Sequence, residues 1–530
     1  MDRSSSSSHD KEKFADEAAV QHPDLDAHVH VADVSKAKAK EERPEAYYVE
    51  RFGRFGPFLE KMFASGVEAR GVERVPEDQR TMKNAWNNLL MWWSVNCVLT
   101  TIPIGVLAQE FYTLTLPHAI AVIFCFGALG GVFTAFIATL GPKTGMRTMI
   151  IARYSSGYVG GMIYSVLNIL TQLGFSTTCV ILGGQTLASI NPGTLPLVVG
   201  IIIVGVSSLI PCFVGYNLVH VYERYAWLVT TLIMLFLYGL GGKAGYSVGA
   251  QKPLEDKGRN LAGDVLSFGG IVFGSFTGWA PVAADYNCRL PSSISSTRVF
   301  LLTFLGLFIP ITFVEILGAA LMTIQSPAYP AAFASGGTGG LLAQTLSPWG
   351  GFGKFLLTLL ALSVVANNIP NTYSAGLSAQ ALGRPFAAIP RALWTLAAFA
   401  AYTVAGVVGR EHFSTILSNF LAILGYWTAF FVVIVAEEHY IFRRKGGLLG
   451  GYDLDVYDDF GRLPMGLAGI FAGCCGVAGA VVGMAEVWYV GPIGRKIGEF
   501  GGDLGFELAA AFAAITFPPL RWLEIKYTGR

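Results

Sequence analysis

Residues 93–103 read Trp-Ser-Val-Asn-Cys-Val-Leu-Thr-Thr-Ile-Pro, and residues 274–281 read Gly-Ser-Phe-Thr-Gly-Trp-Ala-Pro. Both stretches lie within apolar segments of roughly 20 residues, the length that a transmembrane helix needs. Each carries hydroxyl side chains and a proline, which interrupts a helix because it has no N–H to donate. A helix broken at membrane depth offers free backbone groups to a substrate or ion, as in secondary carriers. The two stretches therefore predict a carrier with two interrupted helices.

Further apolar segments flank these two, separated by short polar or Gly/Pro-rich gaps. We expect membrane-spanning helices at 86–108, 117–140, 160–186, 195–214, 221–242, 265–283, 299–324, 353–381, 390–408, 414–436, 464–485 and 503–520. The interrupted segments are the first and the sixth, and this spacing predicts an inverted repeat of five helices. The predicted fold class is an all-α polytopic membrane protein with twelve transmembrane helices. Residues 486–502 also fit a re-entrant or external loop.

The composition excludes several classes of protein. The 530 residues are 53% hydrophobic and 14% charged, whereas soluble domains carry about 25% charged residues. The net charge of +1 gives no indication of a nucleic-acid partner. The seven cysteines lack metal-ligand spacing, and the sequence contains neither a phosphate-binding loop nor a nucleophile–base pair. We therefore expect no metal, no cofactor and no enzymatic activity.

The distribution of charge predicts domains and orientation. Residues 1–83 form a polar, Ser-rich tail that we expect to be largely disordered, 84–521 the transmembrane domain, and 522–530 a short C-terminal end. The N-terminus does not read as a secretory signal peptide. Loops on the tail's side hold roughly fifteen Lys and Arg and the opposite loops roughly eight, which places both termini in the cytoplasm by the positive-inside rule.

The eighth apolar segment contains Asn367-Asn368-Ile-Pro370-Asn371-Thr-Tyr-Ser. Three amides at membrane depth are costly unless they bond to something. Asn367 and Asn371 are four residues apart and share a helix face, where their donors and acceptors match the edge of a heterocycle. Asn368 points elsewhere, and we expect it to bond a neighbouring helix. The alternative is that all three asparagines only join helices.

Several motifs together resemble the fungal purine–cytosine permeases of the nucleobase–cation symporter family, from about Asn84 to the end of the chain. They are the asparagine motif at 367–374, His220-Val-Tyr-Glu-Arg-Tyr-Ala-Trp227, Gly278-Trp-Ala-Pro-Val-Ala-Ala-Asp-Tyr286, Glu438-His-Tyr-Ile-Phe-Arg443 with Tyr452-Asp453, and the closing stretch 521–530. The resemblance implies a five-plus-five inverted repeat with two accessory helices. It also implies import of purine bases or cytosine by proton symport across the plasma membrane, with the proton gradient as the energy source.

In the family, the substrate lies between aromatic side chains of helices three and six and is hydrogen-bonded from helix eight. Carried onto this sequence, the resemblance and the residue types give the candidate substrate-binding residues Ser94, Asn96, Gln172, Phe175, Cys179, Phe276, Trp279, Asn367, Asn368, Pro370 and Asn371. The sequence does not fix the register between Phe276 and Trp279. Proton coupling requires a titratable group within the membrane, and the candidates are Glu223, Asp285 and Glu315, each of which can also have a purely structural role. Sodium coupling is less expected, because the turn before Asn367 offers a single hydroxyl, Ser363.

Helix three departs from the family pattern. In the purine–cytosine branch this helix carries a motif that resembles Gly-Trp-Ser-x-x-Asn, whereas this chain has Gly174-Phe175-Ser-Thr-Thr-Cys179. Phe175 keeps a stacking face but lacks an indole N–H, and Cys179 replaces an amide; Gln172, one turn away, can compensate. Loss of a buried polar partner shifts selectivity strongly. A different heterocycle such as pyridoxine is therefore the alternative substrate, and a non-transporting nutrient sensor is the alternative function.

Overall fold

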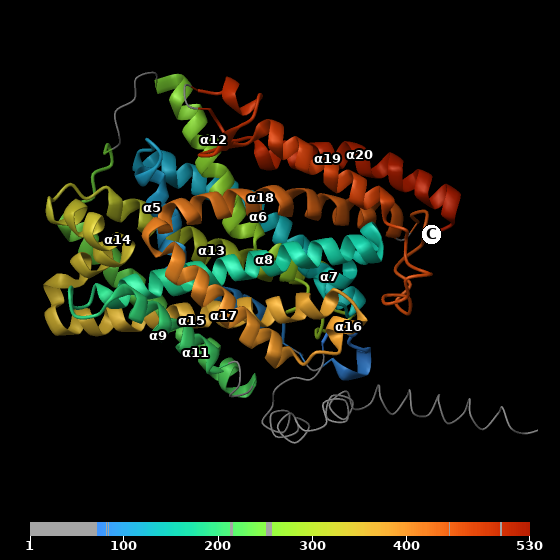
Figure 1. The fold of residues 1–530 in the computed structure, drawn as a ribbon, viewed down its shortest axis with the longest axis horizontal. Helices are drawn as coiled ribbons and strands as arrows, with labels where there is room; N and C mark the ends of the chain where they lie inside the picture. Colours follow the sequence, from blue (N-terminus) through green and yellow to red (C-terminus); the bar gives the residue numbers. More distant parts are fainter. Residues whose placement is uncertain are drawn as a thin grey trace, which may run out of the picture. The chain divides into compact units, whose positions relative to one another are not determined.

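The computed structural model describes residues 71–80, 82, 84–211, 216–250, 257–444, 446–498 and 501–530, without the side chains of 216–226 and 257–260. Most of the predicted N-terminal tail thus lies outside the described residues. The described part is built almost entirely of helices (Figure 1). Its α-helices are α4 (Trp86–Asn96), α5 (Ile102–Glu110), α6 (Leu116–Thr144), α7 (Thr148–Ile151), α8 (Arg153–Ala188), α9 (Leu197–Leu209), α11 (Tyr216–Ala244), α12 (Lys257–Thr277), α13 (Ser296–Met322), α14 (Ala328–Leu346), α15 (Gly350–Ala381), α16 (Arg384–Ala387), α17 (Arg391–Gly409), α18 (Phe413–Glu437), α19 (Leu467–Gly483) and α20 (Gly505–Thr528).

Each of the twelve predicted segments contains one of these helices. Among the described residues, eight helical stretches are long and apolar enough to cross a membrane. The bent pair of α4 and the helix that follows it makes a ninth, and α9 and α19 are shorter apolar helices. The chain is therefore an all-α, multi-pass membrane protein. The helix α20 also continues to Thr528, beyond the predicted end of its segment.

Both predicted interruptions are present. The helix α4 ends at Asn96, the chain is extended at Val98 (φ −136°, ψ 168°), and it resumes at a bend of 64° through the 3₁₀ turn Leu99–Thr101 into α5. Pro103 lies in the first turn of α5, where its missing N–H leaves no helical bond unmade. In the second interruption α12 ends at Thr277 and the 3₁₀ turn Ala280–Val282 follows. The breaks therefore fall on the residues that carry the candidate polar and aromatic side chains.

Close backbone contacts hold the first broken helix against α13. A Cβ on Gly105 would lie 1.7 Å from the carbonyl oxygen of Glu315, and one on Gly318 would lie 2.0 Å from that of Ile102. Small residues at such positions let transmembrane helices pack at short distance. The same arrangement places Glu315 directly beside the broken helix.

The helix α14 was not predicted. Its Gly-rich stretch 336–340 reads as a loop, yet the chain forms a helix that is broken at Gly337, where φ is 58°. Figure 1 shows α14 at one end of the bundle and α7 and α16 at the other. We call the end with α7 and α16 the N-terminal side, because residues 71–80 contact it, and the other end the opposite side.

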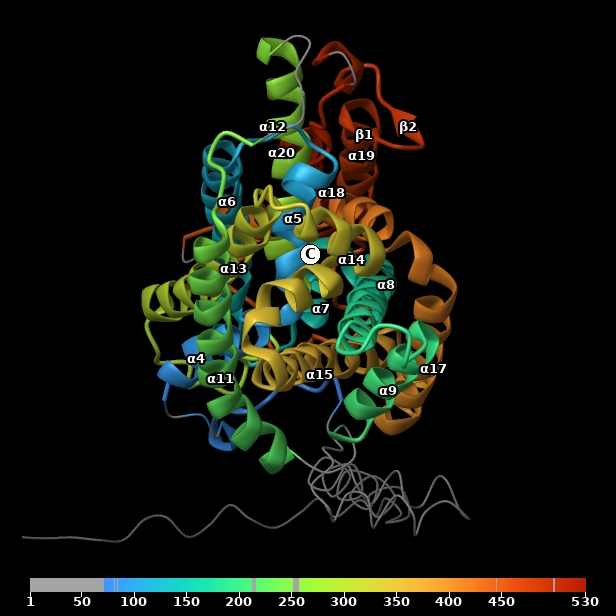
Figure 2. The same ribbon diagram turned by 90° about the vertical axis from the view of Figure 1, so that its left-hand side faces the viewer.

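Figure 2 shows that the α19–α20 hairpin lies beside α18, with the two short strands at one end. These strands are β1 (Ala485–Glu486) and β2 (Tyr489–Val490), paired antiparallel with Glu486 opposite Tyr489. The region 486–502 is therefore a structured loop rather than part of a long helix.

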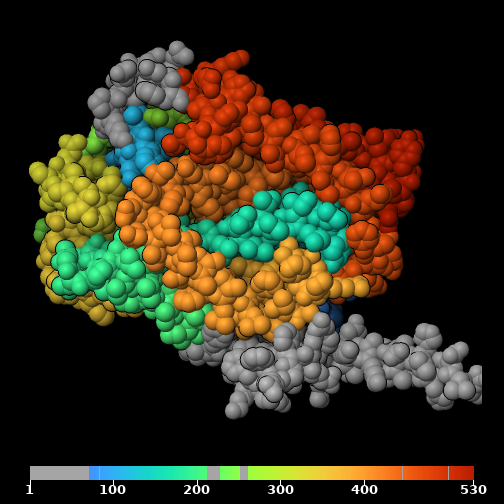
Figure 3. Space-filling view, in the orientation of Figure 1, coloured from blue at the N-terminus to red at the C-terminus, as the bar shows by residue number. Residues whose placement is uncertain are grey.

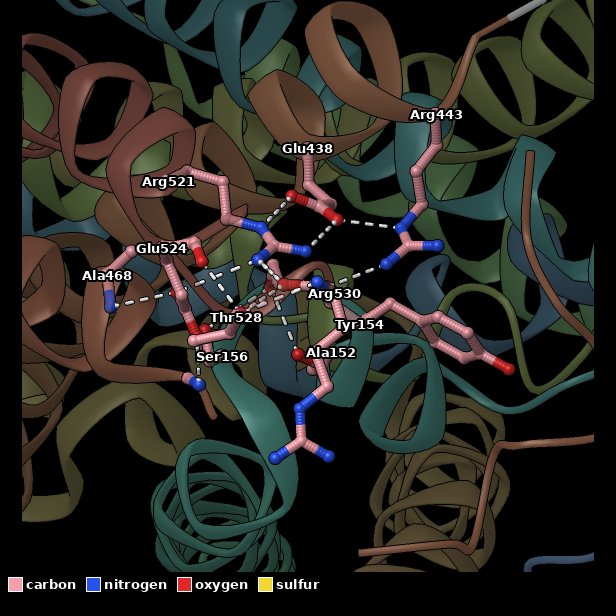
Figure 4. Close-up of polar contacts among 12 residues, drawn as sticks. Ala152, Tyr154, Ser156, Glu438, Arg443, Ala468, Arg521, Glu524, Thr528 and Arg530 are labelled. Atoms are coloured by element: carbon pink, nitrogen blue, oxygen red, sulfur yellow. Dashed lines mark hydrogen bonds and ion pairs between the residues drawn. The ribbon is translucent and has the colours of Figure 1, made fainter. Parts of the chain in front are cut away.

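A polar cluster fixes the hairpin to the core on the N-terminal side (Figure 4). Arg521 on α20 is fully buried and donates two hydrogen bonds to Glu438, at 2.9 and 3.2 Å. Arg443 donates a third to the same carboxylate at 2.7 Å, and Glu524 accepts from the backbone N–H groups of Gly466 and Ala468. The motifs at 438–443 and 521–530, far apart in the sequence, thus meet in one ion-paired site. Such a cluster is costly to break because an unpaired buried charge would remain.

A second polar cluster joins the hairpin to α18 near the strands. The Tyr426 hydroxyl contacts both Glu486, at 2.9 Å, and Asp503. One hydroxyl has one proton to donate, so two ionised carboxylates around it are not both satisfied. Burial and the neighbouring Asp503 raise the pKa of Glu486 to about 8.

This pKa shift predicts how stability depends on pH. A carboxyl whose pKa is higher in the folded state holds a proton that the unfolded chain has already released above its own pKa of 4.5. Stability should therefore fall, on the order of a few kcal/mol, as pH rises from that value to about 8. Thermal unfolding of the purified protein across this range checks the prediction, and Glu486→Gln should flatten the profile. An identical profile in wild type and Glu486→Gln would contradict it.

Candidate substrate-binding site

A pair of parallel aromatic rings lies where the sequence places the substrate. Phe175 on α8 and Trp279, just after α12, have ring centres 6.1 Å apart and an angle of 11° between their planes. A planar ring between two others needs about 7 Å, twice the usual contact distance of carbon atoms. The distance between the ring centres is about 1 Å shorter than this, so the two rings must move apart to admit a flat heterocycle. Figure 3 shows α8 running between α18 and α17.

The break in the first helix orients the tryptophan. The indole Nε1 of Trp279 donates to Asn96 Oδ1 at 2.9 Å, and Asn96 Nδ2 donates to the Trp92 carbonyl at 2.8 Å. Trp92 in turn packs edge-on against Trp279, with ring centres 5.5 Å apart. Asn96 thus acts as a support for Trp279, and both of its polar side-chain atoms are used within the protein.

The asparagines of α15 reach the same break. Asn367 Nδ2 donates to the Val95 carbonyl at 2.6 Å, which is one of the backbone groups freed at the end of α4. Asn371 Nδ2 donates to Asn367 Oδ1 at 3.2 Å, and Cys179 Sγ lies 3.3 Å from the same oxygen. Helices α4, α8 and α15 are therefore connected through Asn367.

Several buried polar atoms in this region have no partner among the described residues. They are Ser94 Oγ, Gln172 Oε1, Asn371 Oδ1 and both side-chain atoms of Asn368. An unsatisfied polar group costs about 1–3 kcal/mol when buried, so a set of them needs an explanation. Ser94, Gln172 and Asn371 come from three helices. Ser94 precedes Val95, whose carbonyl bonds Asn367, and Asn371 bonds Asn367 as well. Gln172 lies one turn before Phe175 of the aromatic pair. A polar ligand that accepts and donates hydrogen bonds would satisfy them.

Three other predicted residues lie outside this set of contacts. Phe276 points towards α6, where a Cβ on Gly127 or Gly130 would lie 2.7–2.8 Å from its side chain. Of the two residues, Trp279 is the one whose ring lies parallel to that of Phe175. Asn368 was expected to bond a neighbouring helix, and this prediction is wrong: neither atom of its amide has a partner among the described residues. Pro370 lies inside α15 and cannot donate to the Ala366 carbonyl.

Two polar residues that were not predicted extend the site. Gln172 Nε2 donates to Asn168 Oδ1 at 2.9 Å, and Asn168 Nδ2 donates to Ser378 Oγ on α15 at 2.7 Å. The sequence does carry a signal for these residues: Asn168 and Gln172 are four residues apart, as are Ser374 and Ser378. Polar residues at this spacing lie on one face of a helix. These bonds join α8 and α15 on the N-terminal side of the aromatic pair.

The three acidic candidates differ in their surroundings. Glu315 on α13 is fully buried; its Oε1 accepts from Ser275 Oγ at 2.8 Å, and its Oε2 has no partner among the described residues. Asp285 instead accepts from the Thr148 backbone N–H at 2.7 Å and so caps α7. The side chain of Glu223 lies outside the described residues. An acidic group at membrane depth is expensive and marks a functional position, and Glu315 is the candidate beside both broken helices.

Comparison with known proteins gives the family. Residues 74–493 match the family of permeases for cytosine/purines, uracil, thiamine and allantoin. The purine-cytosine permease fcyB of Emericella nidulans is 39% identical over 467 residues, which cover 88% of this chain and 90% of that protein. The purine-cytosine permease FCY2 of Saccharomyces cerevisiae is 36% identical over 89% of each chain, and its vitamin B6 transporter TPN1 is 32% identical over 89% of this chain and 90% of TPN1.

A solved structure agrees on the fold. The nucleobase-cation-symport-1 family transporter MHP1, in a closed conformation with bromovinylhydantoin bound, superposes with a TM-score of 0.64 at 14% sequence identity and covers 87% of this chain and 97% of that one. The match in fold agrees with the two broken helices. The chain therefore belongs to the nucleobase–cation symporter family, in its fungal purine–cytosine permease branch, and is a transporter rather than an enzyme.

Proposed function

We propose that this chain imports purine bases, cytosine or both by proton symport across the plasma membrane. The observation that carries the proposal is the parallel pair of Phe175 and Trp279, together with the unpartnered amide oxygen of Asn371. Asn371 bonds Asn367, and Asn367 contacts Cys179, one turn beyond Phe175 on α8. Aromatic rings bind flat bases at about 1–3 kcal/mol per stacking contact. A nucleobase also presents donors and acceptors at its edge, which the free atoms of Asn371, Gln172 and Ser94 complement.

The relatives support this substrate class, since those with the highest identities cited above are named purine-cytosine permeases. In this proposal the N-terminal side faces the cytoplasm, because Lys and Arg are concentrated in its loops. Glu315 carries the coupling proton, since it is buried beside Ser275 with one oxygen free and adjoins both interrupted helices. No cofactor is required.

Uptake of labelled hypoxanthine and cytosine tests the function. A yeast strain without its own permeases should gain saturable uptake when it expresses this chain, and the uptake should be faster in acidic than in neutral medium. A fluorescent tag must show that the protein reaches the plasma membrane. Absence of uptake from protein at that membrane would exclude nucleobases as substrates, and absence of uptake of any heterocycle would favour a nutrient sensor.

Pyridoxine is the second candidate substrate. It is favoured by the contact of Cys179 with Asn367, which puts a weak thiol donor where the purine–cytosine branch has an amide, and by the vitamin B6 transporter among the relatives. Competition of unlabelled pyridoxine against labelled hypoxanthine separates the two substrates.

Restoring the branch's residues should shift selectivity. The double variant Phe175→Trp, Cys179→Asn adds an indole N–H and an amide to the site, and each new hydrogen bond is worth about 1 kcal/mol. We expect the ratio of the inhibition constants of pyridoxine and hypoxanthine to rise by about tenfold or more, in favour of hypoxanthine. Competition assays in the same strain measure this ratio. An unchanged ratio would mean that these two residues do not contact the substrate.

A further inference from the structure

Residues 71–80, which we call the strap, cross the ends of two elements on the N-terminal side. Val75 N–H donates to the Gly145 carbonyl at 2.8 Å, and Arg74 Nε donates to the Thr144 carbonyl at 3.1 Å, both at the end of α6. Arg80 Nη1 donates to the carbonyls of Pro142 and Leu290, at 2.6 and 3.2 Å. The strap therefore ties α6 to the segment that follows the second broken helix.

The strap is held by charge as well as by backbone contacts. The Arg80 side chain is only 2% exposed and forms an ion pair with Glu77 at 2.9 Å. Glu77 accepts from the Ser292 backbone N–H at 2.9 Å, and this bond lowers the pKa of Glu77. A buried arginine that is both ion-paired and bonded to carbonyl groups indicates a built contact rather than a passing one.

Arg147 connects the strap with the substrate-binding helix α15. Its side chain is buried, its Nε donates to the Gly71 carbonyl at 2.8 Å, and its Nη2 donates to the Tyr373 hydroxyl at 3.3 Å. Tyr373 is two residues beyond Asn371 on α15. The next residue, Thr148, bonds Asp285, beyond the second break. Two consecutive residues, Arg147 and Thr148, thus contact the strap, α15 and the segment beyond the second break.

We propose that the strap is an inner gate that closes the route from the site to the N-terminal side, and that Arg147 is the positioning residue that links its closure to α15 through Tyr373. The inference rests on the proposed function for the direction of transport. On the opposite side the described residues around α14 and the end of α8 line a cavity of about 1010 Å³. Release to the cytoplasm then requires the strap to leave the end of α6.

Gly145 makes this contact possible. Its φ is 70°, and a Cβ there would lie 2.5 Å from the Val75 carbonyl oxygen and 2.6 Å from Arg80 Nη2. Any side chain at this position must displace the strap. Gly446, in a loop on the same side, has a φ of 89°, and a Cβ there would have no neighbouring atom within 4 Å. Gly446→Ala therefore imposes similar backbone strain without touching the strap.

The experiment measures exposure of the strap. Val75 is 6% exposed, so a Val75→Cys thiol should react slowly with a membrane-impermeant maleimide in inside-out vesicles. Gly145→Ala should raise its labelling rate about tenfold or more, as the loss of one or two hydrogen bonds allows, and Gly446→Ala should leave the rate unchanged. Arg80→Gln, which removes the bonds to Pro142 and Leu290, is a second test if Gly145→Ala does not fold. Protein without the Val75→Cys change corrects for the native cysteines.

Equal labelling rates in Gly145→Ala, Arg80→Gln and their parent would overturn the proposal. So would fast labelling of the parent itself. This arm needs no substrate, so it reports on the strap even if nucleobases are not transported. A second arm adds hypoxanthine to the parent vesicles: a changed labelling rate supports coupling of the gate to the site. A Tyr373→Phe variant loses the hydroxyl that accepts from Arg147 but keeps the bond from Arg147 to Gly71. It should label like the parent without substrate but lose the response to it.

Discussion

Uptake by the Asn371→Ala variant should fall to a small fraction of wild-type uptake at substrate concentrations near the wild-type KM. The amide of Asn371 offers an unpartnered oxygen, and its Nδ2 bonds Asn367, which in turn bonds the Val95 carbonyl at the break in the first helix. Its loss removes substrate hydrogen bonds worth about 1–3 kcal/mol and loosens a second contact. We expect the apparent KM to rise by ten- to a hundredfold or more, roughly the equivalent of that energy.

A matched control separates this effect from a loss of folding. Asn287 is also a fully buried asparagine with one amide oxygen unpartnered among the described residues, but its Nδ2 bonds within its own turn to the Ala283 carbonyl, beyond the second break. Asn287→Ala should keep the wild-type KM even if less protein reaches the membrane. Similar KM values in Asn371→Ala and wild type would remove helix α15 from the binding site.

Accumulation against a gradient should disappear in the Glu315→Gln variant, while exchange of labelled for unlabelled substrate continues. Glutamine keeps the size of the side chain and the bond to Ser275 but cannot carry a proton. In a one-to-one proton symporter each pH unit of gradient is worth about tenfold accumulation, or 1.4 kcal/mol. We therefore expect the accumulation ratio in acid-driven vesicles to fall to about one, with exchange rates within a few-fold of the wild type.

Asp285→Asn is the corresponding control. Asp285 caps α7 through the Thr148 N–H, and an asparagine oxygen can accept the same bond, so this variant should still accumulate substrate. Full accumulation by Glu315→Gln would show that another group carries the proton, and Glu223 would then be the next residue to replace.

Much of the fold could be predicted because membrane helices leave a strong signal. A helix lies in each of the segments predicted from apolar length, and the prolines with adjacent hydroxyls located both breaks. Among the described residues, eight or nine helical stretches are long and apolar enough to cross a membrane. The helix α14 was missed because its glycines read as a loop. The strap was missed because its contacts are backbone carbonyls on distant elements, such as Pro142 and Leu290, which carry no sequence signal.

The site was predicted in part for similar reasons. The structure pairs Phe175 with Trp279 and Asn367 with Asn371, and their role in binding substrate stays a prediction. Side-chain direction was not predictable where a break leaves the helical register open, as for Phe276, or where a buried amide has no visible partner, as for Asn368. Asn168 and Ser378 were missed because single polar residues in apolar helices usually only join helices.

Proton symport of nucleobases is tested most directly by uptake of labelled hypoxanthine and cytosine into liposomes that contain only this purified protein, with an inward proton gradient and no sodium. We expect accumulation above the external concentration, and we expect it to collapse when a proton ionophore is added. Proton-coupled nucleobase import would be contradicted by accumulation that survives the ionophore or requires sodium. It would also be contradicted if pyridoxine, but neither base, were accumulated.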